Sequence, residues 1–128
     1  VQAQPIVIHA GKLLDQPGKA PRGPATIVVD GGRIISVESG HQPGPAGARI
    51  IDLSDKFVLP GLIDSHVHLT SDSGGLAAQL EGVTLSPAAQ AFNAQANGMK
   101  TLRAGFTTVR NLGDGDGAVF ALRDAVAA

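Results

Sequence analysis

The chain has 128 residues, of which 43% are hydrophobic, and its formal net charge is −1. This composition indicates a globular protein and argues against nucleic-acid binding, because the Lys and Arg residues are scattered and form no basic stripe. No apolar stretch is long enough to span a membrane, no basic amphipathic helix suggests attachment to one, and the lack of cysteine excludes a disulfide scaffold or a thiolate metal cluster.

The beginning of the chain leaves the cellular compartment open. The first residue is Val1 rather than Met, which indicates that an N-terminal segment was removed or trimmed. A cytoplasmic protein and a protein exported after cleavage of a signal are both compatible with this start and with the absence of cysteine.

The first 60 residues are predicted to form short strands separated by turns. Val and Ile, which favour strands, mark residues 6–10, 25–29, 33–37 and 49–52. Asp30, Gly31 and Gly32 predict a hairpin between the second and third strands, because glycine tolerates the positive φ angles of tight turns. Residues 16–24 and 42–47 are rich in Pro and Gly, so we expect surface loops without a function there.

The most informative segment is residues 57–69, which have the sequence FVLPGLIDSHVHL. Residues 62–69 are predicted to form a buried β-strand. Because side chains alternate between the two faces of a strand, Asp64, His66 and His68 are expected on one face. Neighbouring imidazole nitrogens are good ligands for zinc and related divalent metals, so this face predicts a metal site.

Two ordinary histidines in a strand are the alternative interpretation, and for an isolated His-x-His pattern it is the favoured one. In this chain the neighbouring residues favour a metal site over two ordinary histidines. An acidic residue shares the face with the histidines, and burying two imidazoles in such an apolar strand would be costly without a ligand.

After residue 61 the pattern changes to alternating strands and helices. A polar loop is expected at residues 70–75, and Ser86 and Pro87 predict the start of a helix that runs to residue 104, with Gly105 as its C-terminal cap. A strand at 106–112, a loop at 113–117 and a helix at 118–128 follow. The helix at 87–104 carries a stripe that we expect to pack in the core, not to bind a cofactor: Phe92, Ala96, Met99 and Leu102.

These elements predict a βαβα unit whose two strands are parallel, and such a unit does not enclose a core. The chain also ends at Ala128 inside a helical pattern, without a capping residue. A barrel of eight such units takes roughly 250 residues. We therefore expect a truncated polypeptide whose core is completed by residues beyond this chain.

Residues 58–69 resemble the signature of the amidohydrolase superfamily, and residues 105–111, GFTTVRN, resemble the second barrel strand of its peptidase-like branch. Within that branch the chain resembles prolidase-like and imidazolonepropionase-like enzymes, including amidohydrolases that hydrolyse the amide of the mycotoxin ochratoxin A. The resemblance implies an α/β fold. Residues 1–60 would be strands of a small β-sandwich domain, and residues 61–128 would be the opening βαβα of a metal-dependent (β/α)8 barrel.

The resemblance also implies a metal-based mechanism. One or two zinc ions would activate water to attack an amide carbonyl, with His66 and His68 binding one of them and Asp64 as a candidate for orienting them. Other family ligands are a carboxylated lysine on the fourth barrel strand and two further histidines, and an aspartate on a late strand acts as base. None of these has a counterpart among the residues present, which include four lysines outside that strand: Lys12, Lys19, Lys56 and Lys100.

Four further features carry less weight, and among them only Arg110 is a site candidate. Residues 114–117 (DGDG) lack the ligand pattern of a calcium loop, so a turn before a helix is predicted there. Arg110 lies near the end of a barrel strand, where an active-site role and a structural ion pair are equally favoured. Asn111 stands where many relatives have aspartate. His9 and His41 are each expected to be alone and incidental.

Two functions are compatible with the sequence. In the first, the chain is the N-terminal part of a metal-dependent hydrolase that cleaves a small-molecule amide or a dipeptide, such as a peptidase-like or ochratoxin-type substrate. Its partners would be the remaining C-terminal polypeptide and further copies in a homo-oligomer, and the 128 residues alone would be inactive. In the second, the chain is a noncatalytic or domain-swapped piece that binds metal weakly through His66 and His68.

Overall fold

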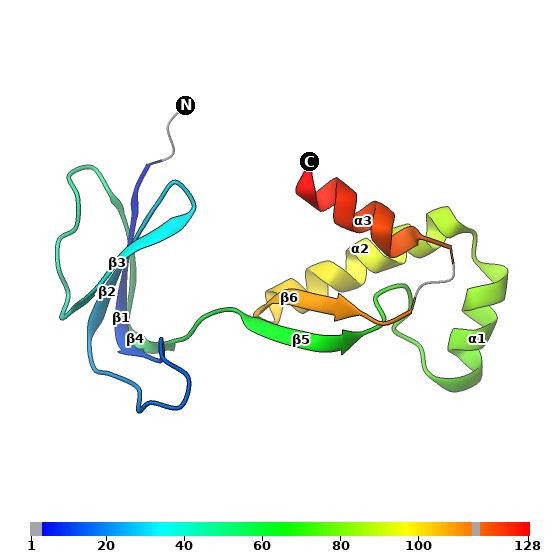
Figure 1. The fold of residues 1–128 in the computed structure, drawn as a ribbon, viewed down its shortest axis with the longest axis horizontal. Helices are drawn as coiled ribbons and strands as arrows, with labels where there is room; N and C mark the ends of the chain where they lie inside the picture. Colours follow the sequence, from blue (N-terminus) through cyan, green and yellow to red (C-terminus); the bar gives the residue numbers. More distant parts are fainter. Residues whose placement is uncertain (1–3, 114–115) are drawn as a thin grey trace. The chain divides into compact units, whose positions relative to one another are not determined.

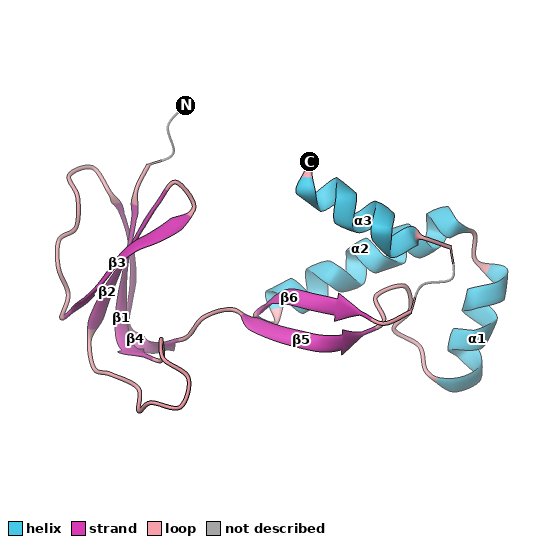
Figure 2. Ribbon diagram, viewed as in Figure 1, coloured by secondary structure: helices cyan, strands magenta, loops and turns pink. Residues whose placement is uncertain are grey.

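The computed structural model describes residues 4–113 and 116–128. The chain divides into two units, Val1–Pro60 and Gly61–Ala128. Figure 1 follows both units from the N-terminus to the C-terminus, and Figure 2 shows that helices occur in the second unit and not among the described residues of the first. No helix among the described residues is long and apolar enough to cross a membrane.

A four-stranded sheet forms the first unit. Its strands are β1 (Ile6–Leu13), β2 (Ala25–Asp30), β3 (Arg33–Ser39) and β4 (Arg49–Val58). They lie in the order β3-β2-β1-β4, with β2 antiparallel to β1 and β3, and β4 parallel to β1. All four predicted strands are present, but each is longer than predicted. The strand β4 extends to Val58 and so includes the first two residues of the segment 57–69.

The predicted hairpin joins β2 to β3. Asp30 pairs with Arg33, and the two residues between them, Gly31 and Gly32, have φ angles of 54° and 74°. The apolar residues of β1 and β2 supply the core of this unit, including Ala10, Leu13, Ala25 and Ile27. Complete burial of a large apolar side chain such as Leu13 or Ile27 contributes about 1.5–3 kcal/mol to the free energy of folding. The buried residues of β1 and β2 therefore stabilise the sheet.

The second unit has a parallel strand pair connected through helices. Its elements are β5 (Leu62–Val67), α1 (Gly75–Thr84), α2 (Pro87–Arg103), β6 (Phe106–Asn111) and α3 (Ala118–Ala127). The parallel pairing of β5 with β6 and the helix α2 between them confirm the predicted βαβα order. The helix α1 is an additional element that the sequence analysis missed.

Both ends of α2 form as predicted. The Ser86 hydroxyl accepts a hydrogen bond from the Ala89 amide at 3.3 Å, with proline at the start of the helix. At the other end, Gly105 has a φ angle of 98°, which suits the residue that follows a helix.

The expectation that β5 is buried is wrong for the described residues. Ile63 is 71% exposed, because no helix of the described residues packs extensively on the face of β5. The stripe on α2 is also not core within this chain, since Phe92 is 72% exposed and Met99 and Leu102 are close to half exposed. These three side chains line an apolar hollow of about 880 Å³ formed by α2, β6 and α3.

Candidate metal centre

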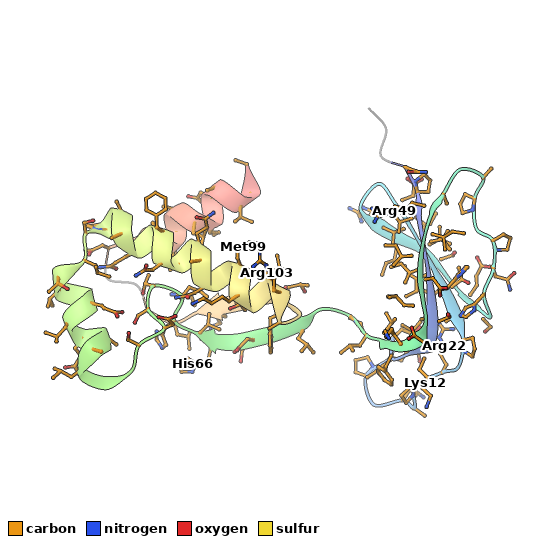
Figure 3. All side chains as sticks on the ribbon, turned by 180° about the vertical axis from the view of Figure 1, so that it is seen from behind. Lys12, Arg22, Arg49, His66, Met99 and Arg103 are labelled. Carbon is orange, nitrogen blue, oxygen red and sulfur yellow. The ribbon has the colours of Figure 1, made fainter. Side chains whose placement is uncertain are left out.

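His66 and His68 lie at the C-terminal end of β5. Their ring centroids are 5.4 Å apart, and the ring planes are inclined by 62°. Both residues are exposed, and neither ring hydrogen-bonds to any residue that the structure describes. Figure 3 shows the His66 side chain projecting from β5 away from α2. Two adjacent imidazoles with unengaged nitrogens are a donor set that fits a divalent metal such as zinc.

The way in which the chain brings these rings together differs from the prediction. The strand β5 ends at Val67, so His68 lies just beyond it rather than within a strand that continues to residue 69. The register with β6 is also irregular between Asp64 and Val67. The regular part of β5 therefore ends at the residue before His68, although the two rings are neighbours as predicted.

Asp64 contacts the backbone of His66. Its carboxylate oxygen Oδ1 accepts a hydrogen bond from the His66 amide at 3.0 Å. Within residues 4–113 and 116–128, no three His, Cys, Asp or Glu side chains are grouped so that they could hold a metal ion. Asp64 is therefore not placed as a third ligand here, and its contact fixes the chain that carries the His66 ring.

Two asparagines that the sequence analysis did not propose as site residues hold the residue after His68. The Leu69 amide donates to Oδ1 of Asn111 at 2.8 Å, and Nδ2 of Asn97 donates to the Leu69 carbonyl at 2.9 Å. Asn111 is the last residue of β6, and Asn97 lies in α2. The polar pattern at positions 97 and 111 could have suggested buried hydrogen bonds, but it does not identify their partner.

Gly113 packs against the His68 ring. A Cβ atom at position 113 would lie 3.3 Å from both Cε1 and Nδ1 of His68. This is tighter than an ordinary van der Waals contact, so the glycine leaves room for the ring beside the loop that follows β6. A larger residue at this position would push the imidazole away from its present direction.

Glu81 anchors the loop that follows the histidines. Its two carboxylate oxygens accept hydrogen bonds from the hydroxyls of Ser71 and Ser73, and these bonds lower the pKa of Glu81 below its ordinary value of 4.5. Nearby, Lys100 donates to Asp72 at 2.8 Å and thereby lowers the pKa of the Asp72 carboxyl. Both contacts tie segment 71–73 to the helices α1 and α2.

The remaining predicted candidates have different surroundings. Arg110 is exposed and forms no ion pair within the described residues. These residues therefore provide no partner for the structural ion pair, and the active-site role stays a prediction. Residues 114 and 115 of the predicted turn lie outside the described residues.

Contrary to expectation, His9 and His41 are not alone. Their rings stack at 4.9 Å between centroids, because loop 40–42 folds back over β1. His41 Nε2 lies 3.0 Å from the Ala10 carbonyl oxygen, and His9 Nε2 lies 2.8 Å from the Gln42 carbonyl oxygen. These rings are thus engaged with the backbone, in contrast to His66 and His68.

Comparison with known proteins identifies relatives of both units. The model of the amidohydrolase family matches residues 57–128. An allantoinase from Streptomyces avermitilis is 40% identical over 64 residues, which cover 50% of this chain and 14% of the allantoinase. The structure of a Xaa-Pro dipeptidase with bound methionine in its active site matches with a TM-score of 0.86 at 35% identity, over 97% of this chain and 30% of the dipeptidase chain.

A further solved structure, a putative prolidase from Bifidobacterium longum, matches with a TM-score of 0.74 at 28% identity, over 99% of this chain and 28% of the prolidase chain. The chain thus spans less than a third of the length of these relatives. The matches confirm the predicted family and the predicted α/β fold class. The chain belongs to the amidohydrolase family, as a peptidase-like member.

Proposed function

We propose that the chain supplies the first two metal ligands, His66 and His68, of a metal-dependent hydrolase that cleaves small-molecule amides or dipeptides. The observation that carries this proposal is the pair of adjacent imidazoles at the end of β5, neither of them hydrogen-bonded to a residue that the structure describes, within the segment that matches the family model. In this proposal, residues 1–60 belong to a small β-sandwich domain, and residues 61–128 form the first two β/α units of a barrel.

The chemistry that zinc supplies when bound at such a site is a water of lowered pKa and a polarised amide carbonyl. His66 and His68 would hold the ion through neutral ring nitrogens, which makes binding depend on pH. Asp64 fixes the backbone of His66 through its 3.0 Å hydrogen bond. Since a catalytic zinc site takes three protein ligands plus a water, at least one more ligand and a general base would come from other residues of the complete protein.

The relatives support an amide as substrate. One is named as a Xaa-Pro dipeptidase and another as a putative prolidase, so a dipeptide is the substrate class that we propose first. The expected likeness to enzymes that cleave ochratoxin A stays a prediction, and an aryl amide is therefore the second substrate to assay. Arg110, exposed near the end of β6, is a weaker candidate for contacting the substrate.

The test uses the complete protein that contains this chain. Metal is removed with a chelator, zinc is restored, and hydrolysis of dipeptides and aryl amides is followed in the wild type and in His66→Ala and His68→Ala. We expect activity to require the metal and to be nearly abolished in both variants. The matched control is His9→Ala, which removes an imidazole from the first unit and should retain activity. Metal content and turnover equal to the wild type in either site variant would contradict the proposal.

A further inference from the structure

We infer that Asn97 and Asn111 are positioning residues for this metal centre: together they hold the peptide groups of Leu69 and thereby set the direction of the His68 ring. We call Asn97, Asn111 and Leu69 the asparagine clamp. This inference rests on the proposed role of His66 and His68, but it assigns a function to residues that touch neither the metal nor the substrate.

The clamp begins where the strand ladder stops. The strand β5 ends at Val67, whose carbonyl accepts a hydrogen bond from the Leu112 amide at 3.0 Å. Beyond that point the chain has no strand partner within residues 4–113 and 116–128, and the backbone of Leu69 is held by the side chains of Asn97 and Asn111 instead. Oδ1 of Asn111 accepts a hydrogen bond from the Leu69 amide at 2.8 Å, and Nδ2 of Asn97 donates one to the Leu69 carbonyl at 2.9 Å. The Leu69 side chain is only 7% exposed, which adds an apolar anchor to the two polar ones.

Asn111 also hydrogen-bonds to the segment that lies beside the His68 ring. Its Nδ2 donates to the Gly113 carbonyl at 2.8 Å, and Gly113 packs directly against the imidazole. The carboxamide thus connects the backbone that follows His68 to the backbone that faces its ring. Such a bridge needs one acceptor and one donor on the same side chain, which asparagine has and ionised aspartate lacks. Aspartate would instead direct a negative oxygen at the Gly113 carbonyl.

Asn97 is held in the orientation that the clamp requires. Lys100 donates to Oδ1 of Asn97 at 3.1 Å and at the same time pairs with Asp72 at 2.8 Å. Because Lys100 has only donors, it engages the amide oxygen and leaves Nδ2 directed to the Leu69 carbonyl. The orientation of the Asn97 amide thus follows from its partners on both sides.

The experiment compares three substitutions of asparagine by aspartate in the complete protein. Asn111→Asp removes the donor to Gly113, and Asn97→Asp removes the donor to Leu69. Asn93→Asp is the matched control, because Asn93 lies one turn earlier in α2 and its side chain forms no hydrogen bond with the described residues. Zinc affinity is measured by competition with a chelator, cobalt is used to record the visible spectrum of the site, and thermal unfolding is measured on the metal-free proteins.

Residues that orient metal ligands typically change metal affinity by about ten- to a hundredfold when they are replaced. We expect a loss in this range for Asn111→Asp and Asn97→Asp, together with an altered cobalt spectrum, and neither effect for Asn93→Asp. A merely structural role would lower the unfolding temperature and leave the affinity and spectrum of the folded protein unchanged, and that result would overturn the inference. If Asn111→Asp does not fold, Asn97→Asp alone decides, since its carboxylate can still accept from Lys100 and only the bond to the Leu69 carbonyl is lost.

His68→Ala separates the two claims. Loss of metal in His68→Ala with wild-type affinity and spectrum in both clamp variants would overturn the asparagine clamp and leave the metal site standing. Retention of full metal affinity in His68→Ala would overturn the proposed function, and the clamp with it.

Discussion

At the scale of single residues, Asp64 has a proposed role in which a carboxylate supports a metal site without binding the metal. It accepts a hydrogen bond from the His66 amide and is half buried in β5. Its negative charge also lies next to the residue whose ring is proposed to bind a cation. Geometry and charge are thus two separate contributions of Asp64, and substitutions can distinguish them.

Replacement of Asp64 by asparagine keeps an oxygen that can accept from the His66 amide but removes the charge. We expect Asp64→Asn to weaken zinc binding by about tenfold, towards the low end of the effects of residues that orient ligands. Asp64→Ala removes both contributions and should weaken binding further. Zinc titration of the complete protein at limiting metal tests this order. If Asp64→Asn titrates like the wild type, its charge contributes nothing to the site.

The sequence predicted contacts between residues that are close along the chain, but it did not predict contacts between residues that are far apart along it. Two histidines separated by one residue predict neighbouring rings from sequence alone, and the rings are neighbours. The clamp joins Leu69 to asparagines 28 and 42 residues away. Nothing in the local pattern around Asn97 or Asn111 identifies such a distant partner. Similarly, the stacking of His9 on His41 depends on a loop that folds back over β1.

At the scale of elements, the segment between β5 and α1 is held by ionised side chains. Glu81 of α1 accepts from Ser71 and Ser73, and these hydrogen bonds favour its charged form. This loop begins directly after the proposed metal ligands. The strength of the hydrogen bonds from Ser71 and Ser73 to Glu81 should therefore depend on pH.

The pKa of Glu81 is lowered in the folded chain, so its stabilising contacts are fully present above the ordinary carboxyl value of 4.5 and are lost as the pH falls through the lowered value. We expect Glu81→Gln to speed hydrogen exchange in segment 70–74 at neutral pH, with a difference from the wild type that vanishes in acid. Glu38→Gln, a control in the first unit, should leave this segment unchanged. A difference that is the same at every pH would show that the charge of Glu81 is irrelevant.

The elements that could be predicted are those with clear boundary signals. The helix α2 has a serine cap, proline at its start and glycine after its end, and the sequence places it within one residue. The helix α1 has neither a side-chain cap nor buried residues, so its start is not marked in the sequence. The length of β4 depends on its parallel pairing with β1, which is a long-range contact that strand propensity does not reveal.

At the scale of the whole molecule, the second unit leaves much apolar surface uncovered by the described residues. Ile63 of β5 and Phe92 of α2 are each more than two-thirds exposed, and Phe120 of α3 is 60% exposed. Exposed apolar surface and an open strand edge both favour association with other polypeptide. The described residues of the same unit provide only two neighbouring imidazoles for a metal.

We therefore predict that the 128-residue chain by itself does not hydrolyse amides and self-associates in solution. Two histidines can hold a metal loosely, but a catalytic zinc site needs at least one more protein ligand and a base. The measurement is light scattering on the purified chain, combined with assays on dipeptides and aryl amides after zinc is added. A stable monomer with metal-dependent turnover would contradict both the ligand count and the expected association.

The central claim is that His66 and His68 bind the same metal ion. Anomalous diffraction at the zinc absorption edge, from crystals of the complete protein grown with zinc, tests it most directly. We predict a peak at about 2.0–2.1 Å from one ring nitrogen of each histidine, the usual distance between zinc and imidazole nitrogen. Zinc peaks that lie near other residues only, with both rings uncoordinated, would contradict the claim.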